Sequence, residues 1–267
     1  MSASVTTVRR RRGRWRVLPM PALHLVFFGI VLAAYAAALA LDPGLLRFLP
    51  TVPQLVGAFG EIAVDPEFWS AVGATGNAVA LGLSISMVAG SLFALLLSIH
   101  PSIYASFRFL VDFLRTIPPL ALIPVGLLLM GPTLRMEVTL IVASAVWPVV
   151  LQVYYGIVHL DHRFIETARS FRLGMPRTVW FVVAPGVAPS FATALRLATA
   201  MTLLLAVGTE LLAGTDGLGF LVGWYQQAHQ IPRMYAVIIV VGLLGVAINA
   251  LIKLGERRLL SWIEVAR

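Results

Sequence analysis

The sequence predicts an all-α protein that crosses a membrane about six times. Mean hydropathy over the 267 residues is +0.90 and only 12% of the side chains are charged, which lies outside the range of soluble domains. Several apolar runs reach about 20 residues, the length that a helix needs to cross a bilayer. Basic residues gather in alternate loops, as expected for a chain that passes through the membrane repeatedly.

The apolar runs place the six expected spans, in chain order, at 22–41, 74–98, 104–130, 137–156, 187–211 and 234–254. The first follows a basic leader and ends in Ala38-Leu39-Ala40, as a cleavable signal would. Its apolar run of about 18 residues is longer than a usual signal core, so we expect it to remain as a span. Between spans, 42–73 is expected along the membrane interface, and the glycine-rich segment after 212 as a partly re-entrant or surface loop.

Arginine and lysine counts orient the chain. The leader 1–20, the segment 157–186 and the C-terminal end hold fourteen basic residues, whereas the opposite loops hold only Arg47, Arg135 and Arg233. Cytoplasmic loops carry the excess of basic residues, so both termini and 157–186 are expected in the cytoplasm. The expected organisation is a basic N-terminus over 1–20, a transmembrane domain over 21–257 that includes the cytoplasmic segment 157–186, and a tail over 258–267.

Composition also excludes several kinds of chemistry. The chain has no cysteine, and its five histidines show no spacing typical of metal ligands, so we expect neither a metal nor a cofactor. No phosphate-binding loop of the G-x-x-x-x-G-K-[ST] type occurs, so the chain is not expected to hydrolyse nucleotide or to be an enzyme. The net charge of +8 reflects a basic leader beside a span, which favours contact with anionic membrane lipid over nucleic acid.

The segment "FIETARSFRLGMPRTVWFVVAP" at 164–185 interrupts the apolar runs with charges, a glycine and prolines. The spacing of Phe164, Ala168, Phe171 and Met175 predicts one apolar face of a helix over 164–175. On its polar side Glu166 and Arg169 lie three residues apart and can pair. The sequence Gly174-Met175-Pro176 predicts that this helix stops there. The expected result is a short amphipathic cytoplasmic helix between the fourth and fifth spans, with a helix that lies flat on the lipid surface as the alternative interpretation.

This segment resembles the cytoplasmic "EAA" signature of the permease subunits of bacterial ATP-binding cassette importers. Glu166-Thr167-Ala168 match its opening, and Val182-Val183-Ala184-Pro185 match its close, nineteen residues after the glutamate. Arg172 stands where the signature has glycine. The resemblance implies a helix that couples to the ATPase, formed by Phe164, Ile165, Glu166, Thr167, Ala168, Arg169, Ser170, Phe171, Arg172, Leu173 and Gly174.

Three further segments are similar to permeases for nitrate, taurine and alkanesulfonates: "FLRTIPPLALIPVGLLLMG" at 113–131, "TELLAGTDGLGFLVGWYQQ" at 209–227 and "GERRLLSW" at 255–262. The resemblance implies the MetI-like all-α fold. It also implies a homodimer working with two ATPase subunits and an extracytoplasmic solute-binding protein in the bacterial inner membrane. The implied solute is a small anion or similar organic solute, such as nitrate, a sulfonate, taurine or an organic acid.

Polar residues inside the spans are the candidates for a translocation path or gate. Asp112 and Arg115 lie three apart and either neutralise each other or act as a gate, and Pro118 and Pro119 suit a bent helix beside a pore. Arg196 has no charged neighbour at helical spacing, so it needs a distant partner or a solute. Glu210 is expected to accept hydrogen bonds from the backbone between Gly214 and Gly219, with contact to solute as the alternative.

Two other classes of protein stay open at this point. An ion-coupled secondary carrier would use ionisable residues within the membrane, and Asp112, Arg115 and Arg196 meet that requirement. An intramembrane enzyme would need a catalytic pair; Ser91 and His100 lie on neighbouring turns but in no hydrolase motif.

Overall fold

The computed structural model describes residues 48–259 without a gap, together with residues 27, 29–30, 33–37, 41 and 44. The chain divides into two compact units, Met1–Val52 and Pro53–Arg267. The leader 1–20, most of the expected first span and nearly all of the tail lie outside the described residues.

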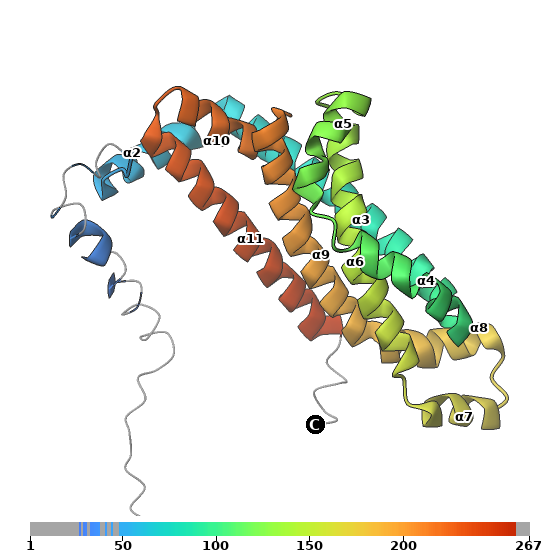
Figure 1. The fold of residues 1–267 in the computed structure, drawn as a ribbon. Coiled ribbons are helices and arrows are strands. Elements are labelled where there is room, and N and C mark those ends of the chain that lie inside the picture. Colours follow the sequence, from blue (N-terminus) through green and yellow to red (C-terminus); the bar gives the residue numbers. More distant parts are fainter. Residues whose placement is uncertain are drawn as a thin grey trace, which may run out of the picture. The chain divides into compact units, whose positions relative to one another are not determined.

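Helices joined by short turns form the second unit where it is described (Figure 1). They are α2 (Val52–Ala63), α3 (Pro66–Ser98), α4 (Pro101–Leu114), the 3-10 turn η2 (Pro119–Leu122), α5 (Ile123–Met130), α6 (Leu134–Val158), α7 (His162–Ser170), α8 (Met175–Thr178), the π-helical turn η3 (Val179–Val183), α9 (Ala184–Ala213), α10 (Leu218–Gln227) and α11 (Ile231–Leu259). Residues 48–259 contain no strand, so the all-α fold class is confirmed.

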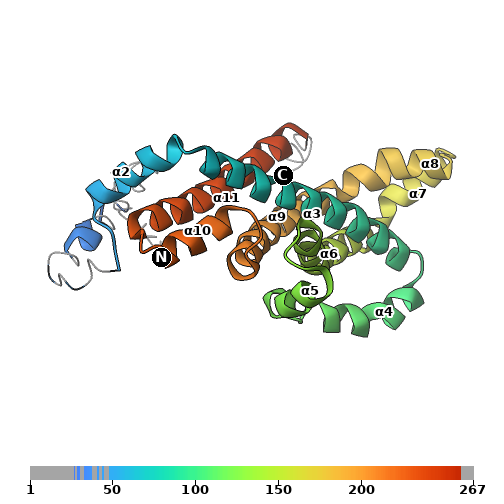
Figure 2. The same ribbon diagram turned by 90° about the horizontal axis from the view of Figure 1, so that it is seen from above.

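Helices α3, α6 and α9 pack against one another, and α6 contacts both of the others extensively. Figure 2 shows the three together in the middle of the unit. Val149 and Val150 of α6 and Ala194 and Ala198 of α9 are fully buried in this core. At Gly90 of α3 an added Cβ would lie 2.8 Å from the Val149 Cβ. Small residues therefore let these three helices approach closely, as membrane helix packing requires.

Four helical segments are long and apolar enough to cross a membrane: Pro66–Ser98, Leu134–Val158, Met175–Ala213 and Ile231–Arg258, among the described residues. A fifth is counted if α4 and the η2–α5 piece form one span. The second span begins at Pro66 and not at 74, because Asp65 caps it by accepting a hydrogen bond from the Glu67 N–H at 2.9 Å. These segments confirm a multi-pass membrane protein.

The third expected span is not one helix. It breaks after Leu114 into α4 and the η2–α5 piece, with a bend of 76° between them. Pro118 and Pro119 lack an N–H, and each also disfavours helical geometry in the residue before it, so the ladder cannot continue through them. His100, which was weighed above with Ser91 as a catalytic pair, is the N-cap residue of α4. Its side chain accepts a hydrogen bond from the Ser102 N–H at 3.2 Å.

The fifth span is longer than expected and begins inside the predicted cytoplasmic segment. Helix runs from Met175 through α8, η3 and α9 to Ala213. Gly174 is its N-cap residue and Pro176 lies in its first turn. Proline is favoured at a helix start because its missing N–H would have no partner there. The helix expected over 164–175 does stop before Gly174, at Ser170, and Pro176 starts the next helix.

At the end of the bundle opposite α7, a short helix replaces the loop expected after 212 (Figure 1). This helix, α10, packs against α9, α11 and α3. Leu218, Leu221 and Tyr225 of α10 are buried in a cluster with Ile62 of α2 and Phe68 of α3. The glycine-rich segment thus folds against the helix bundle, and α10 covers this end of it.

Candidate functional site

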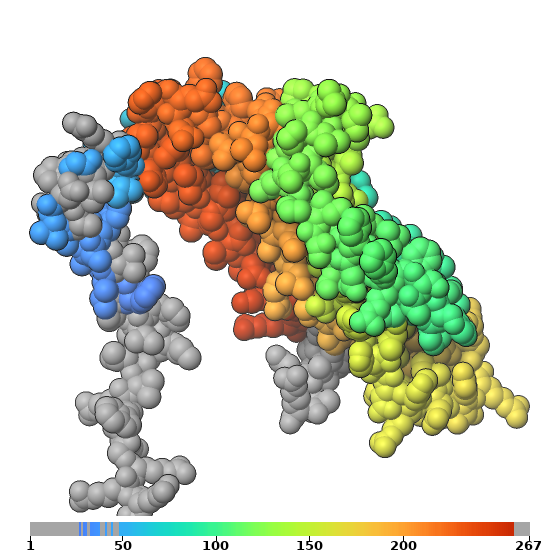
Figure 3. Space-filling model, in the orientation of Figure 1, coloured from blue at the N-terminus to red at the C-terminus, as the bar shows by residue number. Residues whose placement is uncertain are grey.

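Helix α7 lies at the end of the unit opposite α10 (Figure 1). In chain order it connects α6 to the long helix formed by α8, η3 and α9. Asp161 caps it by accepting a hydrogen bond from the Arg163 N–H at 2.9 Å. Ala168 is the buried residue of this helix and the remaining side chains are half-buried or exposed. In the space-filling view the yellow α7 and α8 region projects from the body on the side shown (Figure 3). The chain continues from both ends of α7 into membrane helices, and most side chains of α7 are exposed.

The end of α7 corrects the predicted helix over 164–175. The Leu173 N–H donates to the Ala168 carbonyl at 3.0 Å and the Arg172 N–H to the Arg169 carbonyl at 2.8 Å. These two bonds form a Schellman motif, which requires a left-handed residue between them. Arg172 is that residue, with a φ of 52°. Phe171 and Met175 therefore do not continue the α7 face, and Arg172 does not lie on the helix.

We expect Arg172→Gly to stabilise this turn by about 1 kcal/mol, because glycine adopts left-handed geometry without the clash that a Cβ causes. Hydrogen exchange of the 168–173 amides should slow by roughly fivefold. Arg172→Lys keeps the Cβ and the charge, and should give no such change. Faster exchange in Arg172→Gly than in the parent would show that the arginine side chain itself holds the turn.

Apolar side chains near α7 are unusually exposed for their size. Phe164 is 58% exposed, Phe171 74% and Met175 79%. A cavity of about 570 Å³ opens beside Phe164, and Tyr155 and Phe181 also form its wall. Glu166 and Arg169, expected to pair, form no ion pair with each other or with any other residue of 48–259. Large apolar side chains left exposed together mark a surface that contacts a protein partner or the membrane.

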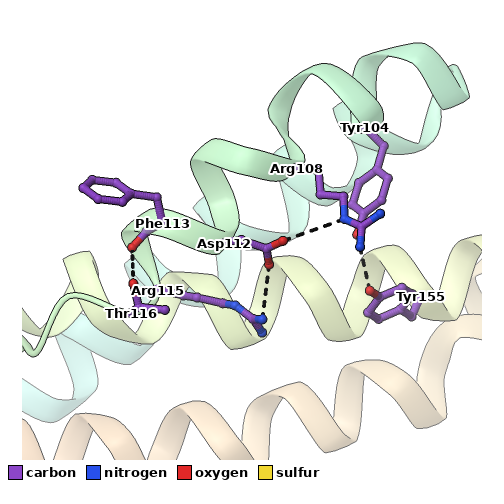
Figure 4. Close-up of polar contacts among 7 residues, drawn as sticks. All are labelled: Tyr104, Arg108, Asp112, Phe113, Arg115, Thr116 and Tyr155. Atoms are coloured by element: carbon purple, nitrogen blue, oxygen red, sulfur yellow. Dashed lines mark hydrogen bonds and ion pairs between the residues drawn. The ribbon is translucent and has the colours of Figure 1, made fainter.

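The candidate gate residues of α4 lie on an exposed face. Asp112 contacts Arg115 at 3.2 Å and Arg108, which sequence reasoning did not single out, at 3.8 Å (Figure 4). The Asp112 side chain is 46% exposed. The expected Asp112–Arg115 pair is thus present, and Arg108 leaves the group with a net positive charge. Pro118 and Pro119 follow directly and form the bend between α4 and α5.

Arg196 finds its partner sixty residues away. Its guanidinium contacts the Glu256 carboxylate of α11. It also lines a groove of about 740 Å³ between α9 and α11, to which Leu120 of η2 contributes. The requirement for a distant partner is therefore met within the chain. Of the residues proposed for the path, Arg196 is the one that this groove contains; Asp112, Arg115, Pro118, Pro119 and Glu210 do not line it.

Glu210 is fully buried at the α10 end of α9. Its Oε2 accepts a hydrogen bond from the Gly219 N–H at 2.8 Å, which is the kind of bond expected from the glycine-rich segment. Next to it, the Leu218 N–H donates to Thr75 Oγ1 of α3 at 2.9 Å. These two bonds hold the start of α10 against α9 and α3.

Glu137 of α6 escaped the sequence analysis, although it is 2% exposed and its carboxyl meets that of Glu210. It lies in the first turn of α6, four residues after the Thr133 N-cap. An acidic residue at the end of a span was the available signal, but acids are common in first turns as partners of the helix dipole. Only the fold brings the two carboxyls together.

Comparison with known families now identifies the chain. Residues 83–261 match the model of the family described as "Binding-protein-dependent transport system inner membrane component". The chain belongs to this family. The permease also resembles curated proteins along most of its length. It is 26% identical over 209 residues to the nitrate import permease protein NrtB of Leptolyngbya laminosa, with 74% of this chain and 75% of that protein covered.

Two further relatives cover the permease more completely. The taurine transport system permease protein TauC of Escherichia coli K12 is 25% identical over 259 residues, covering 95% of this chain and 94% of its own. The putative aliphatic sulfonates transport permease protein SsuC of Bacillus subtilis 168 is 26% identical over 255 residues, covering 96% and 92%. The suspected group of permeases is therefore confirmed.

Solved structures show the same fold. The methionine ABC transporter MetNI in an inward-facing conformation superposes with a TM-score of 0.58 at 19% identity, covering 74% of the permease and 98% of that chain. An amino acid ABC transporter gives a TM-score of 0.55 at 18% identity, covering 76% and 94%. Together with the relatives, they make the permease a subunit of an ABC importer.

Proposed function

We propose that two copies of this permease form the path by which a small solute crosses the bacterial inner membrane, driven by two separate ATPase subunits that bind α7. An extracytoplasmic binding protein delivers the solute, and both termini and α7 face the cytoplasm. The proposal rests on the end of the unit that contains α7. Large apolar side chains are exposed there, in the segment that connects two membrane helices. The names of the relatives favour a small anion or a similar organic solute.

The coupling step follows from how α7 is attached. The Leu173 N–H bond to Ala168 fixes the end of α7, and Gly174 starts the next helix directly. A movement of the ATPase surface against Phe164 and Glu166 would therefore pass into the long helix that carries Arg196. At Gly186 an added Cβ would lie 2.3 Å from Leu160 Cδ1, so this helix is also pressed against the chain just before α7.

We assign the path to the groove side of α9. Arg196 faces the solute there, and the bend at Pro118 and Pro119 brings η2 to the groove wall through Leu120. Asp112 and Arg115 act as a gate on the preceding helix. Glu210, which is fully buried, positions the α10 end of α9 and does not touch solute. The family match favours this function over an ion-coupled carrier.

The first test concerns ATP. The purified permease is expected to hydrolyse none, because the chain has no phosphate-binding loop. Turnover should appear only after the ATPase subunit is added, and phosphate release measured with and without that subunit checks this. A preparation that hydrolyses ATP with no second subunit detectable by mass spectrometry would contradict the assignment of energy coupling to a partner.

A further inference from the structure

Two carboxyl groups lie against each other inside the end of the unit that α10 covers. Glu137 of α6 is 2% exposed and Glu210 of α9 is fully buried, and their carboxyls are close enough for a hydrogen bond between them. Glu210 Oε2 already accepts the bond from the Gly219 N–H. The oxygens Glu137 Oε1 and Glu210 Oε1 find no N–H or O–H donor among the described residues. Each carboxyl thus keeps one oxygen unsatisfied, which is unfavourable in a buried place.

No basic side chain compensates these two carboxyls. The ion pairs formed within residues 48–259 use other acids, namely Glu61, Asp112 and Glu256. Arg135 lies two residues before Glu137 on α6, but it is exposed and forms no ion pair with either carboxyl. Two adjacent buried carboxylates would repel each other and would both lose their hydration. The arrangement is stable only if something neutralises one of the two charges.

The neighbouring helices bring no charge to the pair either. Thr75 of α3 is held by the Leu218 N–H of α10, and α5 and η2 contain no titratable side chain. Tyr225, the titratable residue of α10, interacts instead with the charged groups around Glu61 and Arg233. In the turn before α10, Thr215 lies beside Glu137 and is 4% exposed, and its hydroxyl oxygen is also unsatisfied. Because the unsatisfied atoms beside the pair are all oxygens, this place lacks a hydrogen-bond donor.

The space around the pair favours a proton over a metal ion. Gly217 has a φ of 156°, and an added Cβ there would overlap the Glu210 carboxyl, so the backbone lies directly against that group. An ion with coordinating waters has no room on this side. Glu137 borders a cavity of about 200 Å³ whose wall also includes the exposed residues Asn77 and Asp216, so water can exchange a proton with the pair.

We propose that Glu137 and Glu210 bind one proton between them. The proton is taken from water and sits on Glu137, which donates a hydrogen bond to the Glu210 carboxylate. The negative charge stays on Glu210, because a carboxylate that accepts the Gly219 N–H is stabilised. The proton supplies the missing donor and removes one of the two adjacent charges. It connects α6 to α9, and through Gly219 to α10, whatever the solute or the ATPase.

Infrared spectroscopy can detect this proton, because the C=O stretch of a protonated carboxyl is separate from the bands of carboxylates. The sample is purified permease in a maltoside detergent, which has no ester carbonyl. At about pH 7 the parent should show such a band, although exposed Asp and Glu side chains are ionised there. Glu137→Gln should lose the band, because its amide N–H replaces the proton as the donor to Glu210. Glu67→Gln is the matched control, since Glu67 also lies in the first turn of a span but is exposed, and it should keep the band.

The proton also makes stability depend on pH. Glutamates of the unfolded chain ionise near about pH 4.3, whereas the folded pair keeps its proton above that pH. The folded state then binds more protons than the unfolded state, so stability falls as pH rises, by up to about tenfold in the unfolding constant per pH unit. Between about pH 5 and pH 8 the melting temperature of the parent should therefore fall relative to that of Glu137→Gln. Glu67→Gln should follow the parent.

Several results would overturn the shared proton. One is a parent without a protonated-carboxyl band, which decides the matter even if Glu137→Gln does not fold. Others are a band that persists in Glu137→Gln, or equal pH dependence in the parent and this variant. Sodium chloride against choline chloride, and calcium against a chelator, test for a metal ion. A melting temperature raised by either cation in the parent but not in Glu137→Gln would show that a metal ion, and not a proton, joins the two carboxyls.

Discussion

Gly219→Ala will lower the stability of the permease by about 3 kcal/mol or more, since such overpacking against rigid neighbours is at the upper end of what core substitutions cause. A Cβ at this position would lie 2.1 Å from the Val207 carbonyl oxygen and 2.8 Å from the Leu211 nitrogen. Both are backbone atoms of α9 and cannot turn aside as a side chain can. To relieve the clash α10 would have to move away, which breaks the 2.8 Å bond from the Gly219 N–H to Glu210.

The measurement is the melting temperature of detergent-solubilised protein, together with the yield of folded protein. Gly76→Ala in α3 is the control, because no atom lies within 4 Å of a Cβ there, and it should leave the melting temperature unchanged or slightly raised. Gly223→Ala tests α10 itself, since its Cβ would approach the flexible end of Leu211 at 3.2 Å and the Leu211 carbonyl oxygen only at an ordinary contact distance of 3.8 Å. A Gly219→Ala protein as stable as these two would mean that α10 is not held as the structure has it.

Glu166→Lys will abolish solute uptake while the permease still inserts into the membrane. Glu166 is exposed on α7 and its carboxylate has no ion-pair partner among residues 48–259, so little within the chain depends on it. If the ATPase docks on α7 as proposed, the lysine places a positive charge against a surface that otherwise faces a carboxylate, which is expected to weaken association roughly 100-fold. Pull-down of the ATPase subunit with tagged permease, and uptake in whole cells, measure the two effects.

Glu67→Lys provides a charge reversal of the same kind at the α10 end, where Glu67 is exposed in the first turn of α3. It should leave ATPase pull-down unchanged. Normal assembly and normal uptake in Glu166→Lys would remove this residue from the coupling surface, and α7 would then be the wrong docking helix or would dock through its apolar residues alone.

The parts of the fold that could be predicted are those set by local pattern. An apolar run of about 20 residues predicts α6 almost to its ends. The one helix-breaking residue inside the run is Pro148, and a membrane helix tolerates a proline there. The same reasoning treated 104–130 as one span, because counting apolar residues cannot distinguish one helix from two that meet at 76°. It also treated Pro176 as a stop, although a proline ends or starts a helix depending on which side the helix lies.

The site was less predictable because its contacts join distant parts of the chain. The α7 motif is local, so Glu166 and Ala168 could be placed from spacing alone. The partner of Arg196 is on α11, and the second buried carboxyl beside Glu210 is that of Glu137 on α6, and no helical spacing connects either pair. The left-handed turn at Arg172 was hidden for a different reason: arginine gives no conformational signal there, whereas glycine at the same position would have indicated the end of the helix.

The continuous helix from Met175 to Ala213 is long enough for a small tilt to move its ends by several ångströms. Its 39 residues correspond to about 58 Å of helix, whereas the hydrocarbon core of a bilayer is about 30 Å thick. An arm of the helix therefore extends past the membrane core toward α7. If the pivot lies near the middle of the helix, a tilt of only about 10° displaces the Met175 end by roughly 5 Å. A small tilt of the helix around Arg196 thus corresponds to a large displacement of its Met175 end, and the ratio of the two is set by the distance of that end from the pivot.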